Sequence, residues 1–369
     1  MNITIAKDQL ISGLQSVINV VSARTTLPIL SNVLLRTGNG RLELTATDLD
    51  VTISCSVEAT VKQAGATTIP GKKLSGIVRE LSASEIEIEV DEKNVSQLRA
   101  GASFYKINGL SAEEFPPFPQ FKENKRVVVP QDKLKAMLKK TSFAISTDES
   151  RYVLNGIFFI IKDHKITLVA TDGRRLAMAD EEIDVPENSQ GEFIVPTKAV
   201  NELSRLLQGS GEIEIKFSEN QVSFSLKDEK AFNIVIITKL VEGTYPNYRQ
   251  VIPTETKERV PLSREEFLHA VRRAGLMTSE KANSVKLTFT KNNLAITANS
   301  PDVGEARESL AINYKGKDLA VAFNPNYLVE PLNALTEEEV FVELIDELSP
   351  GVLKINGPFL YVVMPMRLS

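Results

Sequence analysis

Few side chains in this sequence of 369 residues have the types and spacing that chemistry requires. Asp48 and Asp50 form an Asp-x-Asp pair, which could hold a metal ion through carboxylate oxygens. Asp172 takes the corresponding place in a similar later segment, but Ser300 replaces it in a third. A metal site repeated in all three segments would need an acid at this position in each of them. The pattern therefore favours acids that shape a strand-to-turn junction over metal ligands.

The two histidines and the single cysteine give an enzyme little support. His164 lies in KDHK between two apolar segments, and His269 lies among charged residues of a predicted helix, so we expect both to be exposed. Cys55 alternates within an apolar strand and is interpreted as a small buried residue. The GSG at 209–211 lacks the glycine and lysine of a phosphate-binding loop. We therefore predict no enzyme activity, no cofactor and no metal.

Composition is that of an ordinary globular protein, with 42% hydrophobic and 25% charged residues. No apolar run approaches the roughly 18 residues that a spanning helix needs. The first ten residues, MNITIAKDQL, lack a basic region, and Lys7 and Asp8 interrupt their apolar stretch. One cysteine excludes an internal disulfide. We expect a cytoplasmic protein without a signal peptide or membrane segment.

Three repeats organise the chain. LELTATDLD, ITLVATDGR and LAITANSPD begin at residues 42, 166 and 294. Pro70, Pro196 and Pro325 each open a predicted second helix, at spacings of 126 and 129 residues. IEIEV, IEIKF and VFVEL follow at spacings of 127. Three motifs that recur in the same order at nearly the same spacing indicate three homologous domains. Each domain then has a size that is usual for a protein domain.

The segments between the repeats are rich in proline and charge, as FPPFPQFKENK and PNYRQVIPTETKER show. They place the predicted domains at 1–121, 126–253 and 257–369. Within the first repeat, Leu10, Leu14, Val17 and Val21 share one helix face, and strands follow near 31–37, 41–47 and 51–60. Asn39-Gly40 is a signal for a tight hairpin turn, because both residues tolerate positive φ. We predict an α+β fold in which each domain has two β-α-β-β-β units, with helices on one side of antiparallel sheets.

Charge is divided between helices and strands. Six predicted helices, at 7–20, 71–81, 130–141, 197–208, 263–274 and 324–335, carry 13 basic and 7 acidic residues. The helices are therefore at +6 and the rest of the chain at −11, within a net charge of −5. Lysine and arginine also suit any solvated helix face, so this split alone leaves two interpretations. The sharper one is that all helices face an anionic partner such as duplex DNA.

Several motifs resemble one family. They are YVVMPMRL at 361–368, SARTTLPILSNVLL at 22–35, RYVLNG at 151–156, ATDGRRLA at 170–177 and YPNYRQVIP at 245–253. Together they resemble the bacterial β sliding clamp, the processivity subunit of the replicative DNA polymerase, over the whole chain. The resemblance implies a head-to-tail dimeric ring of six similar domains around duplex DNA, with helices lining the hole. Such a ring binds without sequence specificity and performs no reaction.

The resemblance also implies a pocket between the second and third domains for short motifs of the polymerase catalytic subunit, the clamp loader and other clamp-motif proteins. Its matching positions are Leu154, Thr171, Gly173, Arg174, Arg175, Leu176, Pro246, Val251, Val362, Met364, Pro365, Met366 and Arg367. Flexible methionine side chains suit a site that accommodates several partners. We expect Arg175 and Arg367 at a polar rim, and Met364 and Met366 on one face of an edge strand around Pro365.

Some positions depart from the family pattern. Arg174 stands where many members have histidine, Gln250 where arginine is frequent, and Ser369 extends past the usual terminal leucine. Val153 replaces a second aromatic residue beside Tyr152, so we expect that DNA contact to be lost. These differences affect the rim of the pocket and one DNA contact rather than the pocket floor.

Two further surfaces complete the predicted assembly. Arg24, Lys72 and Tyr152 match family positions that touch DNA, and the basic helix faces add further candidates. The DNA-contacting set is Arg24, Lys72, Lys73, Lys139, Tyr152, Lys198, Arg205 and Arg273. The dimer interface is predicted to join Leu276 and Met277 to Phe104 and Ile107 of a second copy. The alternative is a three-repeat scaffold that binds proteins and does not encircle DNA.

Overall fold

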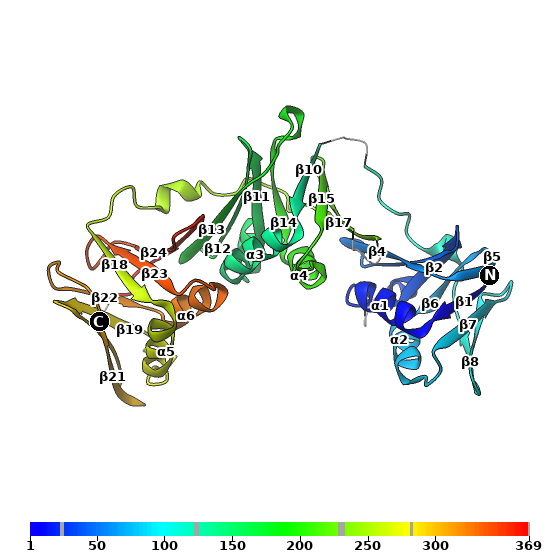
Figure 1. Cartoon of the computed structure of the whole chain (residues 1–369), viewed down its shortest axis with the longest axis horizontal. Coiled ribbons are helices and arrows are strands. Elements are labelled where there is room, and N and C mark those ends of the chain that lie inside the picture. The colour runs from blue at the N-terminus through cyan, green and yellow to red at the C-terminus, as the bar shows by residue number, and fades with distance from the viewer. Residues whose placement is uncertain (23–25, 122–124, 228–232, 281–282, 368–369) are drawn as a thin grey trace. The chain divides into compact units, whose positions relative to one another are not determined.

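The computed structural model describes residues 1–22, 26–121, 125–227, 233–280 and 283–367. The chain divides into two compact units, and each unit contains one eight-stranded and one smaller antiparallel sheet. The first unit comprises Met1–Lys135, Asp184–Gln190 and Lys198–Leu240. The second comprises Ala136–Ile183, Gly191–Thr197 and Val241–Ser369. Figure 1 shows the two units and labels their elements where there is room.

In the sheets of the first unit, neighbouring strands are not always consecutive in the sequence. Its five-stranded sheet has the order β5 (Thr60–Gln63), β1 (Asn2–Ala6), β7 (Glu85–Val90), β8 (Val95–Ala100) and β9 (Ser103–Asn108). Its eight-stranded sheet has the order β10 (Arg126–Pro130), β15 (Glu212–Phe217), β16 (Gln221–Lys227), β17 (Asn233–Lys239), β4 (Val51–Glu58), β3 (Arg41–Thr47), β2 (Asn32–Gly38) and β6 (Ala66–Pro70).

The second unit repeats this plan. Its eight-stranded sheet has the order β14 (Gly191–Pro196), β11 (Gly156–Lys162), β12 (Lys165–Thr171), β13 (Arg175–Glu182), β25 (Phe359–Val363), β24 (Gly351–Lys354), β23 (Glu339–Leu344) and β18 (Glu258–Ser263). Its four-stranded sheet has the order β21 (Gly304–Ala311), β20 (Asn293–Ser300), β19 (Val285–Thr290) and β22 (Leu319–Phe323).

Six helices stand at the expected places. They are α1 (Lys7–Val17), α2 (Gly71–Glu80), α3 (Gln131–Thr141), α4 (Thr197–Leu206), α5 (Arg264–Gly275) and α6 (Pro325–Ala334). Leu10, Leu14 and Val17 are buried, which confirms the predicted apolar face of the first helix, whereas Val21 is buried beyond the end of α1. In the described residues no helix is both long and apolar enough to cross a membrane.

The element order confirms two β-α-β-β-β units for each repeat, with one difference in the first. The strand expected over 51–60 ends at Glu58, and the separate strand β5 pairs with β1 on the other sheet. Asn39 and Gly40 both have positive φ, as the predicted tight turn between β2 and β3 requires.

Each eight-stranded sheet is shared by two repeats. In the first unit, β17 of the second repeat pairs with β4 of the first, with Val235 opposite Ser54. In the second unit, β13 of the second repeat pairs with β25 of the third, with Ala177 opposite Tyr361. Main-chain hydrogen bonds therefore join neighbouring repeats, and the second of these joints underlies the candidate pocket.

Candidate partner-binding pocket and basic helix surface

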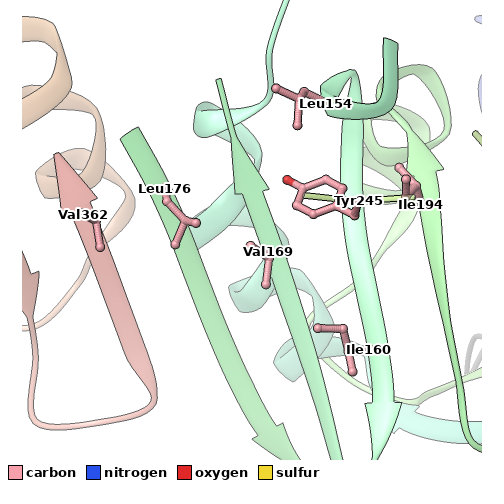
Figure 2. Close-up of a cluster of buried hydrophobic side chains, with 7 residues drawn as sticks. All are labelled: Leu154, Ile160, Val169, Leu176, Ile194, Tyr245 and Val362. Carbon is pink, nitrogen blue, oxygen red and sulfur yellow. The ribbon is translucent and has the colours of Figure 1, made fainter. Parts of the chain in front are cut away.

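A cluster of buried apolar side chains lies across the joint between β13 and β25 and the neighbouring strands (Figure 2). Leu176 and Val362 face each other in register on the two joined strands, and both are 2% exposed. The complete cluster is Leu154, Ile160, Val169, Leu176, Ile194, Tyr245 and Val362. Residues from the second and third repeats thus form one continuous apolar floor.

The segment after β17 packs on this floor. Tyr248 and Ile252 contact the cluster, and the ring of Phe158 stacks on that of Tyr245 with centroids 4.7 Å apart. An open groove of about 710 Å³ adjoins the cluster between this segment and strands β11 to β13. The groove shares only Ile160 and Tyr245 with the buried cluster, and of the pocket positions expected from the sequence only Pro246 lines it.

Tyr245 combines burial with an unused polar atom. Its side chain is 7% exposed, and its hydroxyl forms no hydrogen bond of normal geometry within the described residues, although it faces the backbone of Thr171. Burial raises the pKa of this phenol, so the group stays neutral and can donate. The hydroxyl therefore belongs to the buried part of the floor, beside the backbone of Thr171.

Three large apolar side chains remain exposed beside the buried set. Val251 is 46%, Met364 43% and Met366 38% exposed, and Pro246 and Arg367 are exposed as well. Pro365 does not lie within an edge strand as expected, because β25 ends at Val363. The backbone N–H of Met364 donates to the Arg174 carbonyl (2.9 Å), whereas that of Met366 donates to the Ala322 carbonyl (2.7 Å).

The chain therefore leaves one sheet and bridges to β22 of the other, and proline at the crossing needs no donor. Met364 and Met366 therefore do not share one face of a strand as expected. Their backbone N–H groups are instead bound to two different segments, at Arg174 and at Ala322. Both methionine side chains remain accessible, which is the property that the pocket requires.

The turn between β12 and β13 is built by its own side chains. The Thr171 hydroxyl donates to the Arg175 carbonyl (2.6 Å), and Asp172 Oδ1 accepts the backbone N–H groups of Arg174 (2.9 Å) and Arg175 (3.1 Å). Gly173 has φ +83°, a conformation that glycine adopts without strain. Arg174 is left exposed at the tip of this turn.

Arg175 does not occupy the expected polar rim. Its side chain is only 9% exposed, and its guanidinium donates to Asp172 (3.0 Å), to Glu330 of α6 and to the Phe143 carbonyl (2.7 Å). The guanidinium also lies over the Tyr327 ring, 4.5 Å from its centroid. Burial opposes its charge, but Glu330 holds the pKa of Arg175 above its ordinary value. Arg175 thus ties the second repeat to the third below the pocket.

The predicted DNA-contacting residues fall into two groups. Lys72 and Lys73 on α2, Lys139 on α3 and Tyr152 are exposed, and these three lysines have no ion-pair partner among the described residues. Arg24 lies outside the described residues. At these three lysines a helix presents positive charge to solvent.

The remaining three residues are engaged within the chain. Lys198 pairs with Asp48, and Arg273 pairs with Glu308 (2.6 Å). Arg205 pairs with Glu202 (2.6 Å) and donates to the carbonyls of Gln15 (3.0 Å) and Ser16 (2.9 Å) at the end of α1.

A cation at these orphan carbonyls stabilises the helix end. Arg205 therefore makes a structural contact at the end of α1, and its contact with DNA stays a prediction.

Comparisons with known proteins decide the family. The DNA polymerase III beta subunit family matches with its N-terminal domain at residues 1–119, its central domain at 128–247 and its C-terminal domain at 249–367. The chain belongs to the bacterial β sliding clamp family. The beta sliding clamp of Chlamydia pneumoniae is 35% identical over 368 residues, covering 100% of this chain and 99% of that one.

Solved structures agree. A sliding clamp from Bartonella birtlesii bound to griselimycin is 37% identical with a TM-score of 0.93, and that of Bacillus subtilis is 30% identical with a TM-score of 0.94. Each match covers 100% of both chains. The protein is thus a processivity clamp of DNA polymerase III, and family membership confirms that it is not an enzyme. It also favours the clamp over a three-repeat scaffold.

Two of the edge strands in the described residues come from the smaller sheets, one in the first repeat and one in the last. β9 is an edge strand of the first repeat, and β21 is an edge strand of the third. Phe104 on β9 is 56% exposed and Leu276, directly after α5, is 77% exposed, whereas Ile107 and Met277 are half-buried. Exposed apolar side chains beside unpaired strand edges are typical of an interface.

The residues considered for chemistry are structural or exposed. Asp48 accepts the backbone N–H groups of Asp50 (3.1 Å) and Val51 (2.8 Å), which confirms its role as a turn acid. His164 and His269 are exposed as predicted. Cys55 is 1% exposed, and burial raises the pKa of its thiol to about 11.

Sequence reasoning missed part of the clamp's pocket. Tyr245, Ile160, Val169 and Ile194 belong to the buried floor but were not among the expected positions. Tyr245 lies inside the quoted YPNYRQVIP motif, so its signal was present in the residue before Pro246. The other three are ordinary strand residues whose side of the sheet becomes clear only from the strand pairing.

Proposed function

We propose that the apolar floor and its exposed methionines form the binding pocket for short linear motifs of the replicative polymerase, the clamp loader and other DNA-processing proteins. The decisive observation is the coexistence of a buried floor at Leu176 and Val362 with exposed Val251, Met364 and Met366. A peptide with leucine and phenylalanine anchors would cover these exposed groups. Arg174 and Arg367, both exposed, are the proposed rim charges.

We propose that the ring closes by strand addition between β9 of one copy and β21 of another. Each internal joint between repeats completes an eight-stranded sheet, and the sheets that end in β9 and β21 have five and four strands. Pairing these edges would give a third joint of the same kind, repeated twice in a head-to-tail dimer. Phe104, Ile107, Leu276 and Met277 are the proposed apolar contacts.

The domains of this ring are proposed to be 1–121, 126–253 and 257–369. The unpaired charges of Lys72, Lys73 and Lys139 support duplex DNA as the encircled partner, since phosphate neutralisation needs no base contact. Tyr152, 57% exposed, is proposed to stack against the backbone or a base of the same DNA. Replication takes place in the bacterial cytoplasm, and we place the protein there.

Topology provides the test of this function. The protein would be loaded by a clamp loader onto nicked circular DNA, purified from free protein, and then treated with a nuclease that linearises the circle. A clamp is retained on the circle at high salt and is lost from the free ends. Equal retention before and after linearisation would instead support ordinary DNA binding, and failure of retention on the circle would remove encirclement.

A further inference from the structure

A second cavity, of about 320 Å³, lies within the first unit. One wall comes from β2, β3 and β4, including Leu34, Arg36 and Glu43, and the other from the proline-rich segment that follows β9. Leu34 and Phe115 are buried in a small apolar cluster at its base. No residue of the partner pocket described above contributes to it.

This cavity is the first repeat's counterpart of the partner pocket. The strand positions agree at one spacing: Thr47, Leu49 and Thr52 line the cavity and lie 124 residues before Thr171, Gly173 and Leu176. The covering segments also correspond, with FPPF at 115–118 and YPNY at 245–248. Phe115 and Tyr245, which begin these segments, are each 7% exposed.

The hydrogen bonds repeat as well. The Thr47 hydroxyl donates to the Val51 carbonyl (3.2 Å), as that of Thr171 donates to Arg175. The backbone N–H of Lys239 donates to the Asp50 carbonyl (3.1 Å), as that of Met364 donates to Arg174. The same strand joint and turn thus support both cavities.

The turn in the first repeat holds a strained and exposed side chain. Leu49 has φ +80°, where the second repeat has glycine, and it is 46% exposed. A bulky residue in this left-handed region is costly, and such strain concentrates at binding sites. Phe118 on the opposite wall is 43% exposed. Two large apolar groups therefore flank the opening without covering each other.

The charges at the cavity indicate the chemistry of a ligand. Arg36 is exposed and has no ion-pair or hydrogen-bond partner among the described residues. Glu43 lies opposite Arg36 in the strand register, but one of its oxygens accepts the Ser54 hydroxyl (2.8 Å). Thr45 and Thr52 take the places of Val169 and Leu176, so this site is less apolar than the partner pocket.

We propose that this cavity is a second peptide-binding pocket, specific for a segment that carries one leucine or phenylalanine anchor next to an acidic residue. The anchor fits between Leu49 and Phe118, and the acid pairs with Arg36. The site goes beyond the proposed function, because the family's motif pocket lies in the other unit. A ring of two copies would carry two sites of each kind.

The absence of tryptophan from the sequence permits a local reporter. Phe118→Trp places a single indole at the cavity, and Tyr248→Trp places one at the corresponding point of the partner pocket. Each full-length variant would be titrated with the capped peptide Ser-Asp-Leu-Phe-Asp-Ser and with its counterpart in which lysine replaces aspartate. We expect a saturable fluorescence change at the Phe118→Trp reporter with the acidic peptide and none with the basic one.

Charge variants in the reporter background identify the site. Arg36→Glu should weaken binding of the acidic peptide about tenfold, because attraction becomes repulsion, while Arg36→Lys changes it less than about threefold. Lys93→Glu, an exposed charge reversal that does not line the cavity, should leave it unchanged. Calorimetric comparison of the unmodified chain with its Arg36→Glu variant repeats the measurement without a reporter, because the partner pocket contributes equally to both. No saturable change at the Phe118→Trp reporter, or equal affinity in Arg36→Glu, would overturn the proposal.

Discussion

Replacing Met364 by alanine tests the partner pocket with little disturbance of the fold. The side chain is 43% exposed, whereas its backbone N–H is fixed to the Arg174 carbonyl at 2.9 Å, a bond that alanine retains. Complete burial of a methionine is worth about 1.5–3 kcal/mol, so covering the exposed part contributes about 1 kcal/mol. Met364→Ala should therefore weaken a motif peptide about fivefold.

The assay is calorimetric titration with a capped peptide that contains a glutamine followed by leucine and phenylalanine. Light scattering on the same samples checks that the dimer remains. Val128→Ala is the matched control, because Val128 is 42% exposed on β10 of the other unit. Unchanged peptide affinity in Met364→Ala, with the dimer intact, would refute the pocket assignment.

Three further predictions concern other parts of the chain. Leu276→Ala combined with Met277→Lys should give monomers by light scattering at micromolar concentration, since a charge replaces an apolar contact; a persistent dimer would contradict the interface. Lys72→Glu with Lys139→Glu should weaken duplex binding irrespective of sequence and flatten its salt dependence, with circular dichroism unchanged. Cys55, whose thiol pKa is raised to about 11 by burial, should stay protonated and resist alkylation at pH 8 until the protein unfolds; rapid labelling of the native protein would show the thiol to be accessible.

Local sequence patterns are sufficient to predict the three repeats, the helices and the buried faces of the helices. The similar spacing of Pro70, Pro196 and Pro325 marks the second helix of each repeat because proline is favoured where a helix begins. The split of the expected strand after Glu58 was not visible, since it depends on pairing between β5 and β1. Alternation of apolar and polar residues indicates which side chains lie on each face of a strand, but not which strand it pairs with.

Site residues were hardest to predict where a charge has a distant partner. Arg175 was expected at a rim, but Glu330, 155 residues away, holds it inside. Arg205 also has a structural partner that the sequence does not show, because it caps α1 from 189 residues away. A basic side chain on a helix face looks the same in sequence whether it meets solvent or a neighbouring carbonyl. Only the packing of the repeats distinguishes the two.

Sharing of sheets between repeats has a consequence for how this protein loses its structure. The central strands of one eight-stranded sheet, β17 and β4, come from different repeats, and so do β13 and β25 of the other. Separating two repeats exposes a row of backbone donors and acceptors, so adjacent repeats should open cooperatively. Amide hydrogen exchange should be slower at these central strands than at β6, β10, β14 and β18, the edge strands of the same two sheets. The shared sheet is then the unit that unfolds cooperatively on heating. A single repeat cut out of the chain would expose the edge strand of its half-sheet and would be prone to aggregate through it.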